Sequence, residues 1–347
     1  MDYIIIGGGA SGLACAITLK RLVPDSDVKI LEKCESCGKK ILATGNGRCN
    51  LSNMNMSEAF YNGDSSLIDL VLSSFTTDDC LEFFKSVGLV TTSEEGRIYP
   101  LTLNASSVLN LLLEECRNLD VKIAPDTKVE NIEKQSSGKF RIVTESKEYS
   151  ADVCILALGG KAAKAHGTDG DGYRMLKSLG IRYEPIHPAL VQIKTEGDIT
   201  KSLRGVRVQG TISIDGAGTE EGEILFTDYG VSGIAAMQLS GNTAELISKG
   251  EKPRIHIDLC PSLSEKEITE YIKSRMSHNT HLKISDALLG ILNEKIAKLF
   301  SDENDIDRAA ERIKNFELTA YDTNGYKNAQ VTRAASDTVN LLMNRSR

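Results

Sequence analysis

A glycine-rich turn near the N-terminus constrains the fold of this chain more than any other feature. A short apolar run, Tyr3 to Ile6, is followed at once by Gly7-x-Gly9-x-x-Gly12 and then by apolar residues spaced as in a buried helix. The run is typical of a strand buried on both faces. Glycines in this pattern permit a tight turn out of the strand, a close approach of the backbone to a pyrophosphate, and close packing of the helix on the strand. The pattern predicts the opening of a dinucleotide-binding fold.

A carboxylate stands where such folds bind a ribose. The next candidate strand, 28–31, ends at Glu32, which lies 20 residues after Gly12 (32 − 12 = 20). At about this separation an acidic side chain accepts hydrogen bonds from the adenosine ribose hydroxyls. Because the strand, the glycines, the helix and the acid all agree, a tight turn without a ligand is the weaker interpretation. The motif alone does not distinguish FAD from NAD.

Length and composition predict a globular protein of two or three domains. The chain has 347 residues, of which 41% are apolar and 26% charged, and its net charge is −7. A single core stops growing below this length. The acidic balance argues against a nucleic-acid binder, because neutralising phosphates requires a basic face. We therefore expect a small-molecule substrate and no nucleic-acid partner.

The distribution of apolar residues also bears on location. No apolar run reaches the length of a membrane span, and the N-terminus lacks the basic and apolar regions of a signal peptide. We expect a cytoplasmic protein with no membrane partner, in which the eight cysteines stay reduced. The sequence does not indicate an oligomeric state.

A second glycine-rich segment, 38–53, has a composition suited to wrapping a polar cofactor. It reads Gly-Lys-Lys-Ile-Leu-Ala-Thr-Gly-Asn-Gly-Arg-Cys-Asn-Leu-Ser-Asn and shows little hydrophobic periodicity. Its backbone N–H groups, amides and basic side chains offer many hydrogen-bond donors with little bulk. A plain surface loop could have the same composition, so the residues alone leave both interpretations open.

Together these motifs resemble a known family. Segments 7–12, 38–40 and 44–53 are similar to the bacterial aminoacetone-oxidase-like FAD-binding flavoproteins, which include bile-acid-reductase-like members. The resemblance continues, in family order, at 96–100, 155–160, 167–173, 188–191, 222–233 and 329–332. It implies a non-covalently bound FAD. It also implies a flavin-dependent oxidoreductase that transfers hydride between a small organic substrate or NAD(P)H and the flavin.

The resemblance implies a set of cofactor-binding residues. Gly7, Gly9, Ala10, Ser11 and Gly12 would hold the pyrophosphate, and Glu32 the ribose. The backbone of Val129 would face the adenine, and Gly159 and Gly160 would close the turn after a strand at 153–158. The remaining positions, most of which would follow the ribityl chain and flavin, are Lys33, Lys40, Thr44, Gly45, Asn46, Arg48, Cys49 and Asn50. No catalytic acid or base and no metal site is predicted.

A cysteine pair and an arginine near the predicted cofactor loop each allow a functional interpretation. Cys34-x-x-Cys37 has the spacing of a redox pair, although a chance proximity within a cofactor loop is the favoured interpretation. Arg48 is the one cation among residues 44–53, and a cation beside the flavin pyrimidine would stabilise its reduced, anionic form.

The predicted fold class is α/β: a Rossmann-like FAD-binding domain with an inserted β-domain and a small helical subdomain. We assign 1–185 to the FAD-binding domain, with 323–347 returning to it, 186–260 plus about 313–322 to the β-domain, and 261–312 to the helical subdomain. Helices are expected at 105–119, 264–277 and 285–300, and a hairpin joins strands 129–132 and 140–143.

The end of the chain departs from the family pattern. Relatives continue past 329–332 with a further strand and a glycine-rich helix start, whereas this sequence reads Arg-Ala-Ala-Ser and stops at Arg347. We expect weaker FAD binding as a result, and a catalytically impaired FAD-binding protein is the alternative function. A flavoprotein acting on RNA is a third interpretation, against which the acidic charge speaks.

Overall fold

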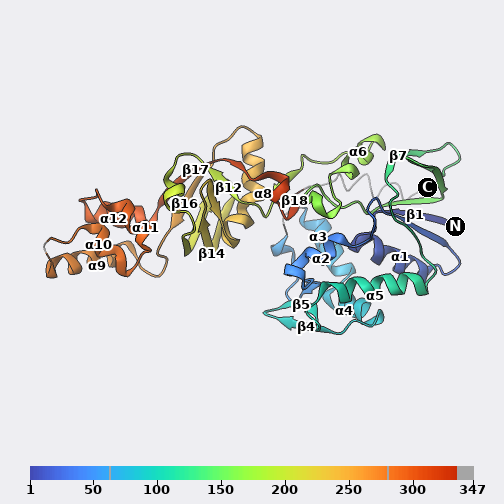
Figure 1. The fold of residues 1–347 in the computed structure, drawn as a ribbon, viewed down its shortest axis with the longest axis horizontal. Helices are drawn as coiled ribbons and strands as arrows, with labels where there is room; N and C mark the ends of the chain where they lie inside the picture. The colour runs from blue at the N-terminus through green and yellow to red at the C-terminus, as the bar shows by residue number, and fades with distance from the viewer. Residues whose placement is uncertain (62–63, 280, 334–347) are drawn as a thin grey trace. The chain divides into compact units, whose positions relative to one another are not determined.

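The computed structural model describes residues 1–61, 64–279 and 281–333. These residues form two compact units, Met1–Glu184 and a second unit that begins at Pro185 (Figure 1). The predicted α/β class with a parallel Rossmann-like sheet is confirmed. The three-part domain scheme stays a prediction, and residues 334–347 of the expected C-terminal return lie outside the described residues.

The sheet of unit 1 has the strand order β10-β1-β2-β6, and all its neighbouring strands are parallel. Ile4, Ile5 and Ile6 are buried because both faces of the central strand are covered. One face packs on helices α1 and α5, which lie side by side (Figure 1). The elements of this layer are β1 (Asp2–Ile6), α1 (Ala10–Leu22), β2 (Asp27–Leu31), α5 (Ala105–Asn118), β6 (Lys122–Ala124) and β10 (Val153–Leu156).

Smaller elements surround this layer. The expected hairpin is present within an antiparallel sheet of order β7-β8-β9, and a second small sheet has the order β3-β5-β4. The bounds of these elements are α2 (Lys39–Ala43), η1 (Thr44–Gly47), β3 (Ser52–Asn53), η2 (Glu58–Phe60), α3 (Ser65–Ser74), α4 (Thr77–Ser86), β4 (Thr91–Glu94), β5 (Arg97–Pro100), β7 (Val129–Lys134), β8 (Phe140–Thr144), β9 (Glu148–Ala151), η3 (Lys164–His166) and α6 (Asp171–Ser178).

Unit 2 is built on a closed antiparallel barrel of order β12-β15-β14-β13-β16-β17. Closure leaves no exposed strand edge, and inward-facing side chains such as Ile212, Phe226 and Ile257 fill the interior. Beside it, β11 pairs with β18. The bounds are β11 (His187–Ala189), β12 (Ile193–Thr195), α7 (Ile199–Ser202), β13 (Arg207–Ile214), β14 (Gly218–Phe226), β15 (Gly230–Ser232), α8 (Ile234–Ser248), β16 (Arg254–Asp258), β17 (Phe316–Thr323), α13 (Gly325–Asn328) and β18 (Val331–Arg333).

A helical segment connects β16 to β17. The expected helix 264–277 is present as α9 (Glu265–His278), and α12 (Ile306–Lys314) packs beside it. The prediction of one continuous helix over 285–300 is wrong, because that stretch forms four short pieces: α10 (Ile284–Ala287), η4 (Leu288–Gly290), α11 (Glu294–Ala297) and η5 (Lys298–Phe300). Two features accompany the interruptions. Gly290 lies so close to the Tyr271 hydroxyl that an added Cβ would come within 2.1 Å of it, and Asn293 is extended and caps a new turn.

None of the helices in the described part of the chain combines the length and the hydrophobicity needed to cross a lipid bilayer.

Replacing the barrel residue Phe226 should destabilise the protein strongly. Its side chain is fully buried and its ring centroid lies 6.0 Å from that of Phe316. Phe226→Ala removes these contacts and leaves a cavity, so we expect a loss of about 3–5 kcal/mol, measured by urea unfolding followed by circular dichroism. Phe226→Leu, which retains most of the volume, should lose clearly less. Equal midpoints for the two variants would contradict this account of the core.

Candidate functional site

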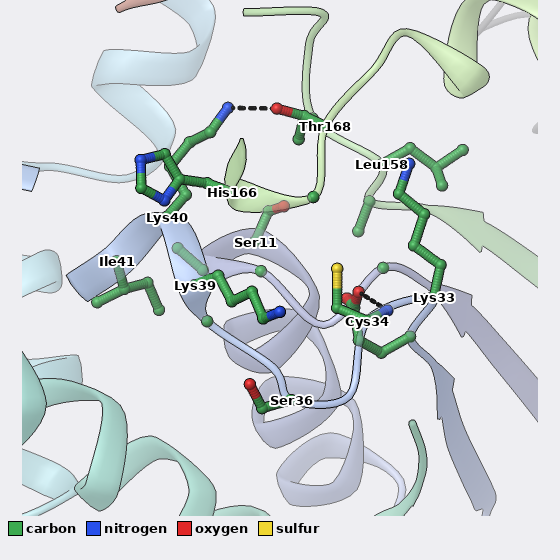
Figure 2. Close-up of a pocket in the computed structure, with 18 of the residues that line it drawn as sticks. Ser11, Lys33, Cys34, Ser36, Lys39, Lys40, Ile41, Leu158, His166 and Thr168 are labelled. Carbon is green, nitrogen blue, oxygen red and sulfur yellow. Dashed lines mark hydrogen bonds between the residues drawn. The ribbon is translucent and has the colours of Figure 1, made fainter. Parts of the chain in front are cut away.

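A cavity of about 450 Å³ opens in unit 1 at the carboxyl ends of the parallel strands. Its lining includes Ile6 at the end of β1, Leu31 at the end of β2, and Ala157 just after β10. Open α/β sheets bind ligands at this edge, because the loops that leave neighbouring strands diverge there. Figure 2 shows the cavity with side chains from α1, α2 and the loop after β10 around it.

The three glycines of the motif between β1 and α1 differ in the space around them. At Gly12 an added Cβ would lie 1.9 Å from the carbonyl oxygen of Gly7, so glycine allows α1 to rest on the turn. At Gly7, where φ is +108°, the Cβ would lie 2.3 Å from the oxygen of Ala157. A Cβ at Gly9 would meet nothing within 4 Å. Gly7 and Gly12 therefore serve packing, whereas Gly9 leaves space on the cavity side.

The first turn of α1 presents positive potential to this space. Gly9 is the N-cap residue, no side chain in the described residues caps the helix, and its first turn contains no acidic residue. The first N–H groups of a helix have no partner within the helix, and the helix dipole adds a partial positive charge there. Ala10 and Ser11, which line the cavity, belong to this turn. The arrangement suits an anion such as a phosphate group.

Glu32 joins two loops of the site. Its Oε2 accepts a hydrogen bond of 2.7 Å from the N–H of Gly8, and its Oε1 accepts one of 2.8 Å from the N–H of Cys34. A carboxylate accepts more than two hydrogen bonds, so both oxygens keep capacity for a ligand. Glu32 and the buried Val129 both line the cavity, at the end predicted to hold adenosine.

Lys33 is neutralised by the protein itself. Its Nζ lies 2.8 Å from Asp169 and 3.1 Å from Asp171. Burial opposes the charged form of Lys33, but the hydrogen bonds with the two carboxylates outweigh burial and raise its pKa. Asp171 also pairs with Arg174; burial opposes its charge, yet its hydrogen bonds lower its pKa to about 2. These pairs attach the segment after β10 to the end of β2.

Lys40 differs, because its partners are neutral. Its Nζ donates to Oγ1 of Thr168 at 2.9 Å and to the carbonyl oxygen of Ala162 at 3.2 Å (Figure 2). The side chain is half-buried, and burial lowers the pKa of Lys40. It lines the cavity from α2.

The structure brings together most of the predicted cofactor residues. Those that line the cavity are Gly7, Gly9, Ala10, Ser11, Glu32, Lys33, Lys40, Thr44, Cys49, Asn50, Val129 and Gly159. Those outside the lining are Gly12, Gly45, Asn46, Arg48 and Gly160. Gly12 acts through packing, as described above. Whether each residue contacts a cofactor stays a prediction.

The guanidinium of Arg48 is directed to other protein groups. It forms an ion pair of 2.8 Å with Glu94 and stacks over the ring of Tyr99 at 4.4 Å from the centroid. The glycines of the segment stand where the backbone is left-handed, because Gly38, Gly45 and Gly47 have φ of +75°, +56° and +83°. Asn46 and Cys49 also have positive φ.

Several lining residues were not among the predicted site residues. Those from the loop after β10 and from the residues just before β7 are Thr127, Lys128, His166, Thr168, Asp169 and Asp171. The glycine-rich run 167–172 was a usable signal, since Gly167 and Gly170 have positive φ and turn this loop across the cavity.

The thiols of the Cys34-x-x-Cys37 motif are not activated. Burial, then the charge of Glu32, raises the pKa of Cys37 to about 12, and burial likewise raises the pKa of Cys34. Both cysteines are free, and Cys37 packs under Gly8, where an added Cβ would lie 2.3 Å from its sulfur. In the described residues no cluster of three or more His, Cys, Asp or Glu side chains could hold a metal ion.

Comparisons with known proteins agree with this geometry. Residues 1–314 match the family model described as the HI0933-like protein Rossmann domain. The chain belongs to the HI0933-like family. It is thus an FAD-binding Rossmann protein and a flavin-dependent oxidoreductase, as the sequence resemblance implied.

Three individual proteins illustrate the relationship. The 3-dehydro-bile acid delta(4,6)-reductase of Clostridium scindens is 36% identical over 346 residues, which cover 94% of this chain and 84% of that protein. The ribosomal RNA dihydrouridine synthase of Haemophilus influenzae is 27% identical, over 97% of this chain and 86% of that protein. Among solved structures, a 3-ketosteroid-delta4-(5alpha)-dehydrogenase of Rhodococcus jostii RHA1 matches 96% of this chain and 84% of its own, at 12% identity and a TM-score of 0.43.

Gly9→Val should separate folding from cofactor binding in this member of the family. The backbone of Gly9 is extended, with φ −78° and ψ −170°, and its surroundings are open, so valine fits the apo fold. The new side chain would occupy the space that a diphosphate must enter, so FAD affinity should fall by roughly 100-fold or more. Flavin fluorescence titration measures the affinity, and thermal unfolding measures the stability.

Gly12→Ala is the matched contrast. Its Cβ would press on a backbone oxygen, so it should lower the unfolding midpoint even without FAD. The opposite pattern, an unstable Gly9→Val and an unaffected Gly12→Ala, would contradict the roles assigned to the two glycines.

The Cys34–Cys37 pair should be inert in the native protein. With the pKa of Cys37 near 12, almost no thiolate is present at pH 8, so iodoacetamide should label Cys37 far more slowly than an exposed cysteine. Labelling should rise steeply on unfolding in urea. Rapid native labelling, or a Cys34–Cys37 disulfide formed under mild oxidation, would support the redox hypothesis instead.

Proposed function

We propose that this protein is an FAD-dependent reductase that moves a hydride from NAD(P)H, by way of bound flavin, to a small organic substrate. The observation that carries the proposal is the cavity at the carboxyl end of the sheet, where an uncapped helix start, an open Gly9 and Glu32 meet. Membership in an FAD-binding family supports FAD as the dinucleotide.

The residues around the cavity fit FAD chemically. Gly9 gives a diphosphate room to approach the backbone, and the N–H groups at the start of α1 suit its charge. Glu32 is held by two backbone N–H groups in a position to accept from ribose hydroxyls. Thr44, Cys49 and Asn50 supply small polar groups along another wall. These residues bind and orient the cofactor, and the apolar part of the lining, such as Phe84 and Leu112, excludes water.

We further propose that the substrate contains a carbon–carbon double bond conjugated to a carbonyl group. The names of two relatives support this class, since one reduces delta(4,6) bonds of a 3-dehydro bile acid and the other produces dihydrouridine. In such a reduction a hydride adds to the β-carbon and a proton to the α-carbon, while NAD(P)H is oxidised to NAD(P)⁺. FAD, when bound, supplies the two-electron carrier between donor and substrate.

A small molecule is the favoured substrate, and we propose that the protein binds no nucleic acid. The bile-acid reductase is more similar to this chain than the ribosomal RNA enzyme is, and the net charge of −7 disfavours contact with a phosphate backbone. All eight cysteines are free in the described residues, which supports the proposal of a cytoplasmic location.

An absorbance spectrum tests the proposal. Purified protein incubated with FAD and then desalted should keep the two flavin bands, and anaerobic NADH or NADPH should bleach them. A 3-oxo-Δ4 steroid added to the bleached protein should restore the bands, whereas the saturated ketone should not. Protein that retains no FAD would refute the proposal, and reoxidation by a ribosomal RNA fragment rather than the enone would favour the RNA function. Gly9→Val provides the control for specific flavin binding.

A further inference from the structure

Three lysines of one short segment line the cavity, but the protein neutralises only two of them. Lys33 pairs with Asp169 and Asp171, and Lys39 lies 3.2 Å from Glu35. The third, Lys40, has no carboxylate within 4.0 Å among the described residues. A fourth cavity lysine, Lys128, is exposed and its charge is screened by water. Lys40 is therefore the half-buried cation whose charge the protein leaves uncompensated.

The contacts of Lys40 hold its ammonium in place without neutralising it. The Thr168 hydroxyl donates its hydrogen to the carbonyl oxygen of Ala162 at 2.6 Å, so its lone pairs face Lys40. Lys40 donates to this hydroxyl and to the same carbonyl oxygen. An ammonium group has three N–H bonds, and these two acceptors leave one for a ligand. Figure 2 shows the side chain of Lys40 extended along the cavity wall toward Thr168.

Such an arrangement costs free energy until an anion arrives. Partial burial disfavours a charged amine, and burial is the cause that lowers the pKa of Lys40. A bound anion would offset this cost through a charge-assisted hydrogen bond. The feature therefore points to a negatively charged ligand group in the cavity.

The diphosphate bridge of a dinucleotide is the anion that fits. The bridge carries two negative charges, whereas a helix start contributes only about half a charge. The first turn of α1 contains no basic residue of its own, since its sequence is Ala-Ser-Gly-Leu. Ser11 of this turn and Lys40 line the same cavity (Figure 2). A full positive charge on the wall of the same cavity would complete the neutralisation.

We propose that Lys40 is the counter-ion of the cofactor's diphosphate, and that it determines affinity for the nucleotide half of FAD rather than the properties of the flavin. The proposal rests on the proposed function, because it takes FAD as the ligand. It differs from the sequence-based expectation, in which Lys40 follows the ribityl chain and flavin. Because Lys40 also holds Thr168 and Ala162, the bound diphosphate and the loop after β10 would share one cation.

Competition binding tests the assignment. FAD affinity is measured by fluorescence titration, and ADP-ribose, which has the same diphosphate diester but no isoalloxazine, is measured as a competitor. Lys40→Met should weaken both ligands by the same factor, roughly 10- to 100-fold, as expected for the loss of a charged hydrogen bond. The flavin absorbance maxima and reduction potential of FAD-saturated Lys40→Met should equal those of the wild type. Weakened FAD with unchanged ADP-ribose, or a shifted potential, would place Lys40 at the flavin and overturn the proposal.

Two variants control for fold and for net charge. Lys40→Arg keeps the cation and should recover most of the affinity for both ligands. Lys85→Met removes the same charge at an exposed position of α4, outside the cavity lining, and should leave both affinities unchanged. If Lys40→Met has a lowered thermal midpoint, the Arg variant decides: recovery supports the charge role, and no recovery refutes it. Wild-type protein that binds neither ligand would instead refute the proposed function.

Discussion

The contact between Gly12 and the carbonyl oxygen of Gly7 is the constraint on which the site depends. It is too close for any side chain, and it fixes the distance between α1 and the end of β1. With α1 seated there, its uncapped first turn lines the cavity through Ala10 and Ser11. The close contact of Gly7 with Ala157 then brings the end of β10 to the same place. Two backbone approaches thus bring the start of α1 and the ends of β1 and β10 together around one volume.

Contacts within the protein also occupy charged side chains around this cavity. Glu32 uses both oxygens to hold neighbouring loops, and Lys33 is occupied by two aspartates. These contacts shape the walls, and the charge of Lys33 is balanced within the protein. The polar groups left to act on a ligand are chiefly the start of α1, Lys40 and the remaining acceptor capacity of Glu32. In such a site the shape of the walls positions the ligand, and a small number of charged or polar groups bind it.

The sequence was informative where the structure is local and uninformative where contacts are distant. The first strand, turn and helix and the position of Glu32 could be predicted, because each depends on residues within one short segment. The far wall of the cavity could not, because Thr168 and Asp169 meet Lys40 and Lys33 across more than a hundred residues of chain. The placement of Arg48 beside the flavin stays a prediction, and its ion pair with Glu94 of β4 has no sequence signature. Likewise, the helical pattern of 285–300 is interrupted at Gly290 by Tyr271, a contact that no local pattern reveals.

The barrel of unit 2 begins and ends on paired strands, since Ile193 of β12 lies opposite Thr323 of β17. The helical segment within the barrel is attached in the same way, because it begins after β16 and ends before β17, and these two strands are paired. Ile257 of β16 lies opposite Phe316 of β17, and Lys314 forms an ion pair with Asp258. A segment whose two ends meet can be lengthened, shortened or exchanged while its host keeps the same hydrogen bonds. The architecture is therefore nested, one replaceable module within another. A change of length in the helical segment would leave the turn at Gly7 and Gly12, where an added Cβ has no room, untouched.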